Sequence, residues 1–130
     1  MSSPPGGDQT VILVEDDTPL RGALAFMFET DGFLVRAFGS AEAALDYGPF
    51  PDRSCLVVDY ILPQMDGLSF LRRVGEGRDP PPSILITSHP SAVLRNQAAE
   101  AGVTIVEKPL LHDDLVEGVR YLLAARRPSA

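Results

Sequence analysis

The sequence has little positive charge and lacks the features of membrane or secreted proteins. Its 11 Lys and Arg residues are outnumbered by 18 Asp and Glu residues, and this net charge of −7 argues against nucleic-acid binding. No apolar run approaches the roughly 20 residues of a membrane span, and the amino-terminal residues do not form a signal peptide. The single cysteine, Cys55, excludes an internal disulfide and is expected in the core. These absences predict a cytoplasmic protein without a membrane or nucleic-acid partner.

Short runs of branched aliphatic residues alternate with helical patterns along the chain. Strands are expected at 11–14, 33–38, 55–59, 84–86 and 103–106, with a helical pattern after each. Right-handed crossovers then give an α/β fold of the flavodoxin-like type, a doubly wound five-stranded parallel sheet of order 2-1-3-4-5. The 130 residues are enough for one domain, expected at 10–125 between a disordered lead-in at 1–9 and a short tail at 126–130.

Charged and hydroxyl side chains come at the ends of four of these strands. Glu15 and Asp16 follow the first strand, Asp59 ends the third, Thr87 follows the fourth and Lys108 follows the last. The carboxyl ends of parallel strands share one edge of a sheet, so we expect these side chains to form one site. Lys108 is the only lysine, whereas arginine occurs ten times, so we expect this lysine to have a role of its own.

The residue types of this site favour phosphoryl transfer to a carboxylate. Clustered carboxylates repel one another, and an all-oxygen site with room for water suits Mg²⁺. Mg²⁺ and an adjacent ammonium would neutralise a phosphoryl group that arrives at an aspartate, and the hydroxyl of Thr87 could hydrogen-bond a phosphoryl oxygen. The residue types alone leave open which aspartate is the nucleophile.

From about residue 10 to about residue 124, the chain resembles the receiver domains of response regulators in two-component signalling. Four motifs in matching order and spacing carry the resemblance: Val14-Glu15-Asp16, Asp59 through Gly67, Thr87-Ser88 and Lys108-Pro109. The resemblance implies that Asp59 is phosphorylated by a histidine kinase or histidine phosphotransferase. It further implies that Thr87 is a switch hydroxyl, that Lys108 binds the phosphoryl group, and that Mg²⁺ is the cofactor. The implied Mg²⁺ site is formed by the side chains of Asp16 and Asp59, the backbone carbonyl of Ile61, and Glu15, which acts through a water.

Two features depart from the family pattern. The family often has Tyr or Phe three residues before the lysine, where this chain has Ile105, and the segment from Gly102 to Lys108 looks about one residue shorter than is common. Both lie near the face formed by the fourth helix, the fifth strand and the fifth helix, where the resemblance places a downstream protein partner. We therefore expect switching that does not use aromatic rotation.

Several functions are consistent with these motifs. We expect a stand-alone receiver that switches partner binding and is not a turnover enzyme; a phosphorelay intermediate or phosphate sink is the alternative. A flavodoxin-like cofactor-binding protein is disfavoured, because acidic residues after the first strand would repel a phosphate. A hydrolase of the haloacid dehalogenase type would need a second aspartate two residues after the nucleophile, where this chain has Ile61.

Overall fold

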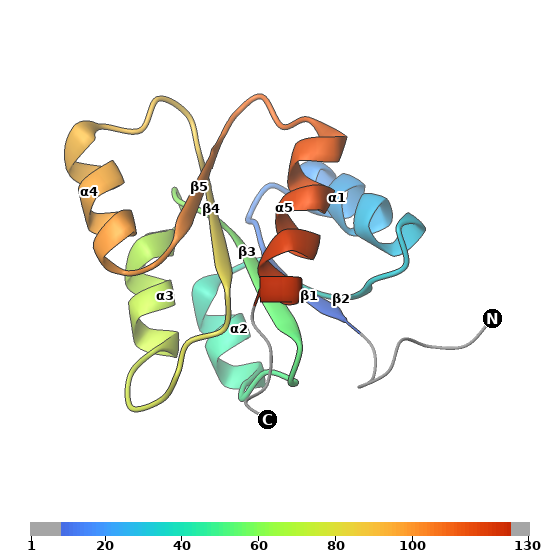
Figure 1. Cartoon of the computed structure of the whole chain (residues 1–130), viewed down its shortest axis with the longest axis horizontal. Helices are drawn as coiled ribbons and strands as arrows, with labels where there is room; N and C mark the ends of the chain where they lie inside the picture. Colours follow the sequence, from blue (N-terminus) through green and yellow to red (C-terminus); the bar gives the residue numbers. More distant parts are fainter. Residues whose placement is uncertain (1–8, 126–130) are drawn as a thin grey trace.

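Five parallel strands form one sheet in a computed structural model that describes residues 9–125 (Figure 1). The strands are β1 (Thr10–Val14), β2 (Leu34–Phe38), β3 (Ser54–Asp59), β4 (Ser83–Thr87) and β5 (Thr104–Glu107). The helices are α1 (Thr18–Thr30), α2 (Ala41–Tyr47), α3 (Gly67–Val74), α4 (Ala92–Glu100) and α5 (His112–Ala125). The strand order β2-β1-β3-β4-β5 confirms the predicted fold. Residues 1–8 of the expected lead-in and the whole expected tail lie outside the described residues.

The helices cover both faces of the sheet because successive strand residues point to opposite sides. Val11 and Leu13 of β1 pack in a cluster with residues of α1 and α5, whereas Ile12 and Val14 pack with residues of α2, α3 and α4. Figure 1 shows the same division, with α1 and α5 on one side of the sheet. Cys55 is fully buried as expected, and burial raises the pKa of its thiol to about 12.

Polar caps fix the starts of four helices. Asp17, Ser40, Asp66 and Ser91 each accept a hydrogen bond from the backbone N–H three residues further along the chain. In three cases the cap lies in a connection that follows a buried strand, β1, β3 or β4. The helices therefore start close to the carboxyl edge of the sheet, and the polar residues between strand and cap are held at that edge.

The second strand begins one residue later than the sequence predicts. Phe33 was expected to open it, but its N–H donates to the carbonyl of Phe28 at 3.1 Å, and its ring packs edge-on against Phe28 with centroids 5.9 Å apart. The turn that ends α1 therefore includes Phe33. Likewise β5 starts at Thr104, because the N–H of Val103 closes the end of α4 by donating to Ala98 at 2.8 Å.

Replacing Gly67 with alanine is expected to lower the free energy of unfolding by about 2 kcal/mol, the usual cost of overpacking. An added Cβ would lie 2.3 Å from the carbonyl oxygen of Asp59 and 2.9 Å from Cδ1 of Leu85, so α3 would have to move away from β3. Urea unfolding measures the change. Gly22→Ala in α1 is the control, since a Cβ there meets nothing within 4 Å. Equal stability of the Gly67→Ala protein and the wild type would show that α3 can shift without cost.

Candidate functional site

The side chains at the carboxyl edge of the sheet converge as the sequence predicts. Glu15, Asp16 and Asp59 each contribute one carboxylate oxygen to a group whose atoms all lie within 4.8 Å of one another. Nζ of Lys108 lies 3.2 Å from Oδ1 of Asp59. The backbone N–H of Lys108 donates to the carbonyl of Thr87 at 2.9 Å. A cation from the end of β5 therefore reaches across β4 to a carboxylate at the end of β3.

Glu15 is the most unusual member of the group. Its side chain is buried, and this burial raises the pKa of its carboxyl group from the usual 4.5 to about 7. The charge of Asp59 makes a smaller contribution in the same direction. The backbone hydrogen bond from Asp17 and the charge of Lys108 lower the pKa. Oε2 accepts a hydrogen bond from the backbone N–H of Asp17 at 3.1 Å, whereas the buried Oε1 has no hydrogen-bond partner among the described residues. A buried carboxylate oxygen without a partner is costly, so it needs a proton, a water or a cation.

Asp59 is also buried, and burial raises the pKa of its carboxyl group. The hydrogen bond and the charge of Lys108 act against this rise, as does a backbone hydrogen bond from Ile61, while the charge of Asp16 adds to it. Lys108 is about one third exposed, so it brings a partly solvated cation to a buried carboxylate. A second anionic group arriving at Asp59 would meet the same cation.

Thr87 and Ile61 are joined to this group through their backbones, because the carbonyl of Thr87 accepts from Lys108 and the backbone of Ile61 hydrogen-bonds Asp59. Thr87 is buried at the end of β4, and its hydroxyl makes a long hydrogen bond of 3.3 Å to the carbonyl of Ser88. Ile61 is 73% exposed, and its backbone hydrogen-bonds the carboxylate of Asp59. Ile105 is half-buried and packs with the α2–α4 side of the core. Lys108 is joined to Pro109 by a cis peptide bond.

Three further residues support the site. Arg21 donates from Nη1 to the backbone carbonyl of Glu15 at 2.8 Å. Gly67 allows α3 to approach the carbonyl of Asp59. Asp17 is the exposed cap of α1, and its N–H also orients the Glu15 carboxylate. Only Asp17 carries a local sequence signal.

The donor set fits a small, hard divalent cation. All three side-chain donors are carboxylate oxygens, which suit Mg²⁺, and Asp16 is exposed enough to leave room for water. The unpartnered Oε1 of Glu15 is a further observation in favour of a cation or an ordered water at this position.

No helix within residues 9–125 combines the length and apolar character needed to cross a membrane.

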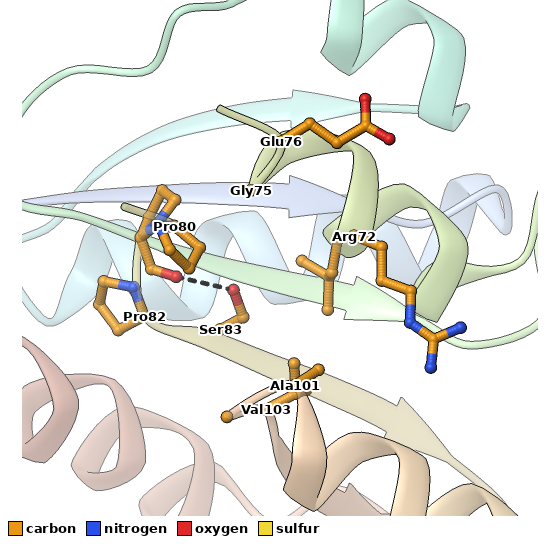
Figure 2. Close-up of a pocket in the computed structure, with 11 residues that line it drawn as sticks. Arg72, Gly75, Glu76, Pro80, Pro82, Ser83, Ala101 and Val103 are labelled. Atoms are coloured by element: carbon orange, nitrogen blue, oxygen red, sulfur yellow. Dashed lines mark hydrogen bonds between the residues drawn. The ribbon is translucent and has the colours of Figure 1, made fainter. Parts of the chain in front are cut away.

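A separate cavity of about 310 Å³ lies at the opposite edge of the sheet. Figure 2 shows Pro80 and Pro82 from the segment that enters β4 and, across from them, Ala101 and Val103 from the turn between α4 and β5. The hydroxyl of Ser83 donates to the carbonyl of Pro81 at 3.0 Å, so it is already used. None of the predicted site residues lines this cavity, and it is therefore not the candidate site.

The chain spans only part of the length of the curated relatives that it matches. The chain is 38% identical over 123 residues to the transcriptional regulatory protein FixJ of Rhizobium meliloti (strain 1021), covering 91% of this chain and 60% of FixJ. It is 35% identical over 120 residues to the C4-dicarboxylate transport transcriptional regulatory protein DctD of the same organism, covering 91% of this chain and 26% of DctD. The resemblance thus covers only part of each relative.

Two solved structures have the same fold as this chain. The crystal structure of FixJ-N superimposes with a TM-score of 0.81 at 34% identity and covers 95% of this chain and 99% of that one. The receiver domain of HemR from Leptospira biflexa gives a TM-score of 0.86 at 21% identity, which supports the fold alone, over 95% of this chain and 100% of that one. The sequence model of the response regulator receiver domain matches residues 11–120. With its fold and its acidic edge, the chain belongs to the family of response regulator receiver domains, the signalling modules of two-component systems.

Proposed function

We propose that Asp59 accepts a phosphoryl group from a phosphohistidine of a histidine kinase or histidine phosphotransferase, and that the modified domain changes its affinity for a protein partner. The observation that supports this proposal most is the position of Asp59, buried beside Lys108 at 3.2 Å and within the acidic group. A carboxylate held next to a cation at a sheet edge can act as a nucleophile, and the product is an acyl phosphate.

The transfer forms one bond and breaks another. A carboxylate oxygen of Asp59 attacks phosphorus, and the bond from phosphorus to the donor's imidazole nitrogen breaks, leaving the electron pair on that nitrogen. Lys108 would stabilise the negative charge of the phosphoryl oxygens, and Thr87 would donate its hydroxyl to one of them in place of the long bond to Ser88. When bound, Mg²⁺ supplies further neutralisation of that charge. It would be held by the side chains of Asp16 and Asp59, by the backbone carbonyl of Ile61 and, through a water, by Glu15.

The proposed output surface is the face of α4, β5 and α5. On this face Val93 of α4 is 65% exposed. Arg95 of α4 and Glu107 of β5 form an ion pair of 3.0 Å on the same face. Because Ile105 cannot swing a hydrogen-bonding ring between core and solvent, the change would start in the loop after Thr87 and pass to α4. The alternative role as a phosphorelay intermediate or phosphate sink stays a prediction.

Other parts of the prediction rest on the sequence alone. The relatives FixJ and DctD are transcriptional regulators and are longer than this chain, so the absence of a nucleic-acid partner rests only on the charge of the chain. The expectations of a stand-alone protein, of a cytoplasmic location and of no turnover activity likewise stay predictions. None of them is needed for phosphorylation of Asp59.

Incubation with a small acyl phosphate and Mg²⁺ is expected to add one phosphoryl group to the wild-type protein and none to Asp59→Asn. Intact mass measures the product, and a chelator is expected to suppress it. Asp46→Asn, which changes an exposed aspartate of α2, is the matched control and is expected to react as the wild type does. Equal modification of Asp59→Asn and wild type would place the phosphorylated residue elsewhere.

A further inference from the structure

The backbone at the end of β1 is held from two sides. The N–H of Glu15 donates to the carbonyl of Phe38, the last residue of β2, at 3.0 Å. The carbonyl of Glu15 accepts from Nη1 of Arg21 at 2.8 Å, and this bond is partly buried. Both polar groups of the Glu15 backbone are therefore used, and the carboxylates of Glu15 and Asp16 emerge from a fixed turn.

The guanidinium of Arg21 is itself confined. A Cβ added to Gly39, the residue after β2, would lie 3.1 Å from Nη1 of Arg21, so the guanidinium rests directly against that glycine. Nη2 lies 3.5 Å from Oγ1 of Thr18 in the first turn of α1, at the limit of a hydrogen bond. Arg21 therefore joins the end of β1, the start of α1 and the connection between β2 and α2.

Arg21 does not act here as the counter-ion of the acidic group. It forms no ion pair with any residue from 9 to 125, and its short bond goes to a backbone carbonyl. The carboxylates of Glu15, Asp16 and Asp59 repel one another when they are ionised, and this repulsion favours opening of the turn after β1. A hydrogen bond to the turn itself opposes that opening.

We infer that Arg21 is a positioning residue, which fixes the backbone of Glu15 so that the Glu15 and Asp16 carboxylates face Asp59 in a geometry suited to Mg²⁺. The inference rests on the proposed function, in which these carboxylates bind the metal. Groups that orient metal ligands from behind typically change metal affinity by about 10- to 100-fold when removed. Arg21 acts on a ligand's backbone, so about tenfold is expected.

Isothermal titration of the full chain with Mg²⁺ gives the Kd for each variant, and thermal melting in chelator gives its stability without metal. Arg21→Ala is expected to raise the Kd about tenfold. The matched control is Arg36→Ala, because the exposed Arg36 also donates to a backbone carbonyl, that of Val35 at 3.2 Å. Arg36→Ala is expected to leave the Kd unchanged.

Gly39→Ala tests the same contact without altering Arg21. Its Cβ has to push the guanidinium aside, so the Kd for Mg²⁺ is expected to rise, though by less than in Arg21→Ala. In the Arg21→Ala background the same glycine change is expected to have no effect on the Kd, because the two residues act through one contact. This variant also keeps the test open if Arg21→Ala does not fold.

The outcomes separate the inference from the proposed function. A lower melting temperature of Arg21→Ala with an unchanged Kd would show a purely structural role and overturn the inference, as would tighter Mg²⁺ binding. Equal effects of Gly39→Ala with and without Arg21 would do the same. If the wild type binds Mg²⁺ and is phosphorylated on Asp59, the proposed function stands whatever the variants do. Failure of the wild type to bind Mg²⁺ would remove both.

Discussion

Replacing Lys108 with alanine is expected to keep the fold and to weaken binding of a phosphoryl mimic at Asp59 by about 10- to 100-fold. Nζ of Lys108 lies 3.2 Å from Oδ1 of Asp59 in the unmodified protein. A phosphoryl group on Asp59 adds negative charge, so the ammonium stabilises the modified state more than the unmodified one. Removing the ammonium narrows the free-energy difference by which the phosphoryl group shifts the population from the unmodified conformation to the modified one.

Titration with beryllofluoride, a mimic of the phosphoryl group, measures this effect. Amide chemical shifts report both the affinity and the extent of the conformational change, and far-ultraviolet circular dichroism reports the fold. Lys108→Arg is the matched variant, since it keeps a cation and changes its shape. Wild-type affinity and wild-type shifts in Lys108→Ala would show that another group couples the phosphoryl group to the fold.

Most of the fold could be predicted because its elements are encoded locally. The buried runs that became β1, β3 and β4 are continuous stretches of branched aliphatic residues, and caps such as Ser40 and Ser91 precede their helices directly. The ends of the strands differ from the prediction by single residues, in the central strands β1, β3 and β4 as well as in the edge strands β2 and β5. Phe33 has the apolar character of a strand residue, but its contact with Phe28 in α1 decides its backbone conformation.

The main residues of the candidate site could be predicted for a topological reason. Parallel strands bring their carboxyl ends to one edge, so Asp59 and Lys108, 49 positions apart, had to come close once the strand order was assumed. The sequence could not show that Arg21, one of ten arginines, donates to the carbonyl of Glu15. It also could not show that Gly67 makes room for Asp59, because close approach between backbones leaves no residue pattern.

Replacing Glu15 with glutamine is expected to remove a loss of stability that the metal-free protein suffers as pH rises. Burial raises the pKa of Glu15 in the folded protein from 4.5 to about 7. The folded protein therefore binds this proton more tightly than the unfolded chain does. The resulting contribution of Glu15 to stability is fully present below pH 4.5, is lost as pH rises towards 7, and stays lost above 7. The difference amounts to at most about 3 kcal/mol.

Urea unfolding in chelator at about pH 5 and about pH 8 measures this difference, because the two conditions lie on either side of the folded pKa. Between them the wild type is expected to lose up to about 3 kcal/mol more than Glu15→Gln, whose amide cannot ionise but can still accept the hydrogen bond from Asp17. Glu29→Gln makes the same chemical change at an exposed position of α1 and is the control. Mg²⁺ binds only the folded arrangement, so its addition at the higher pH is expected to restore stability to the wild type and much less to Glu15→Gln. An equal loss of unfolding free energy in the wild type and in Glu15→Gln would contradict the prediction. It would show that Glu15 has the same charge in the folded and unfolded protein, so that its burial costs the metal-free protein no stability.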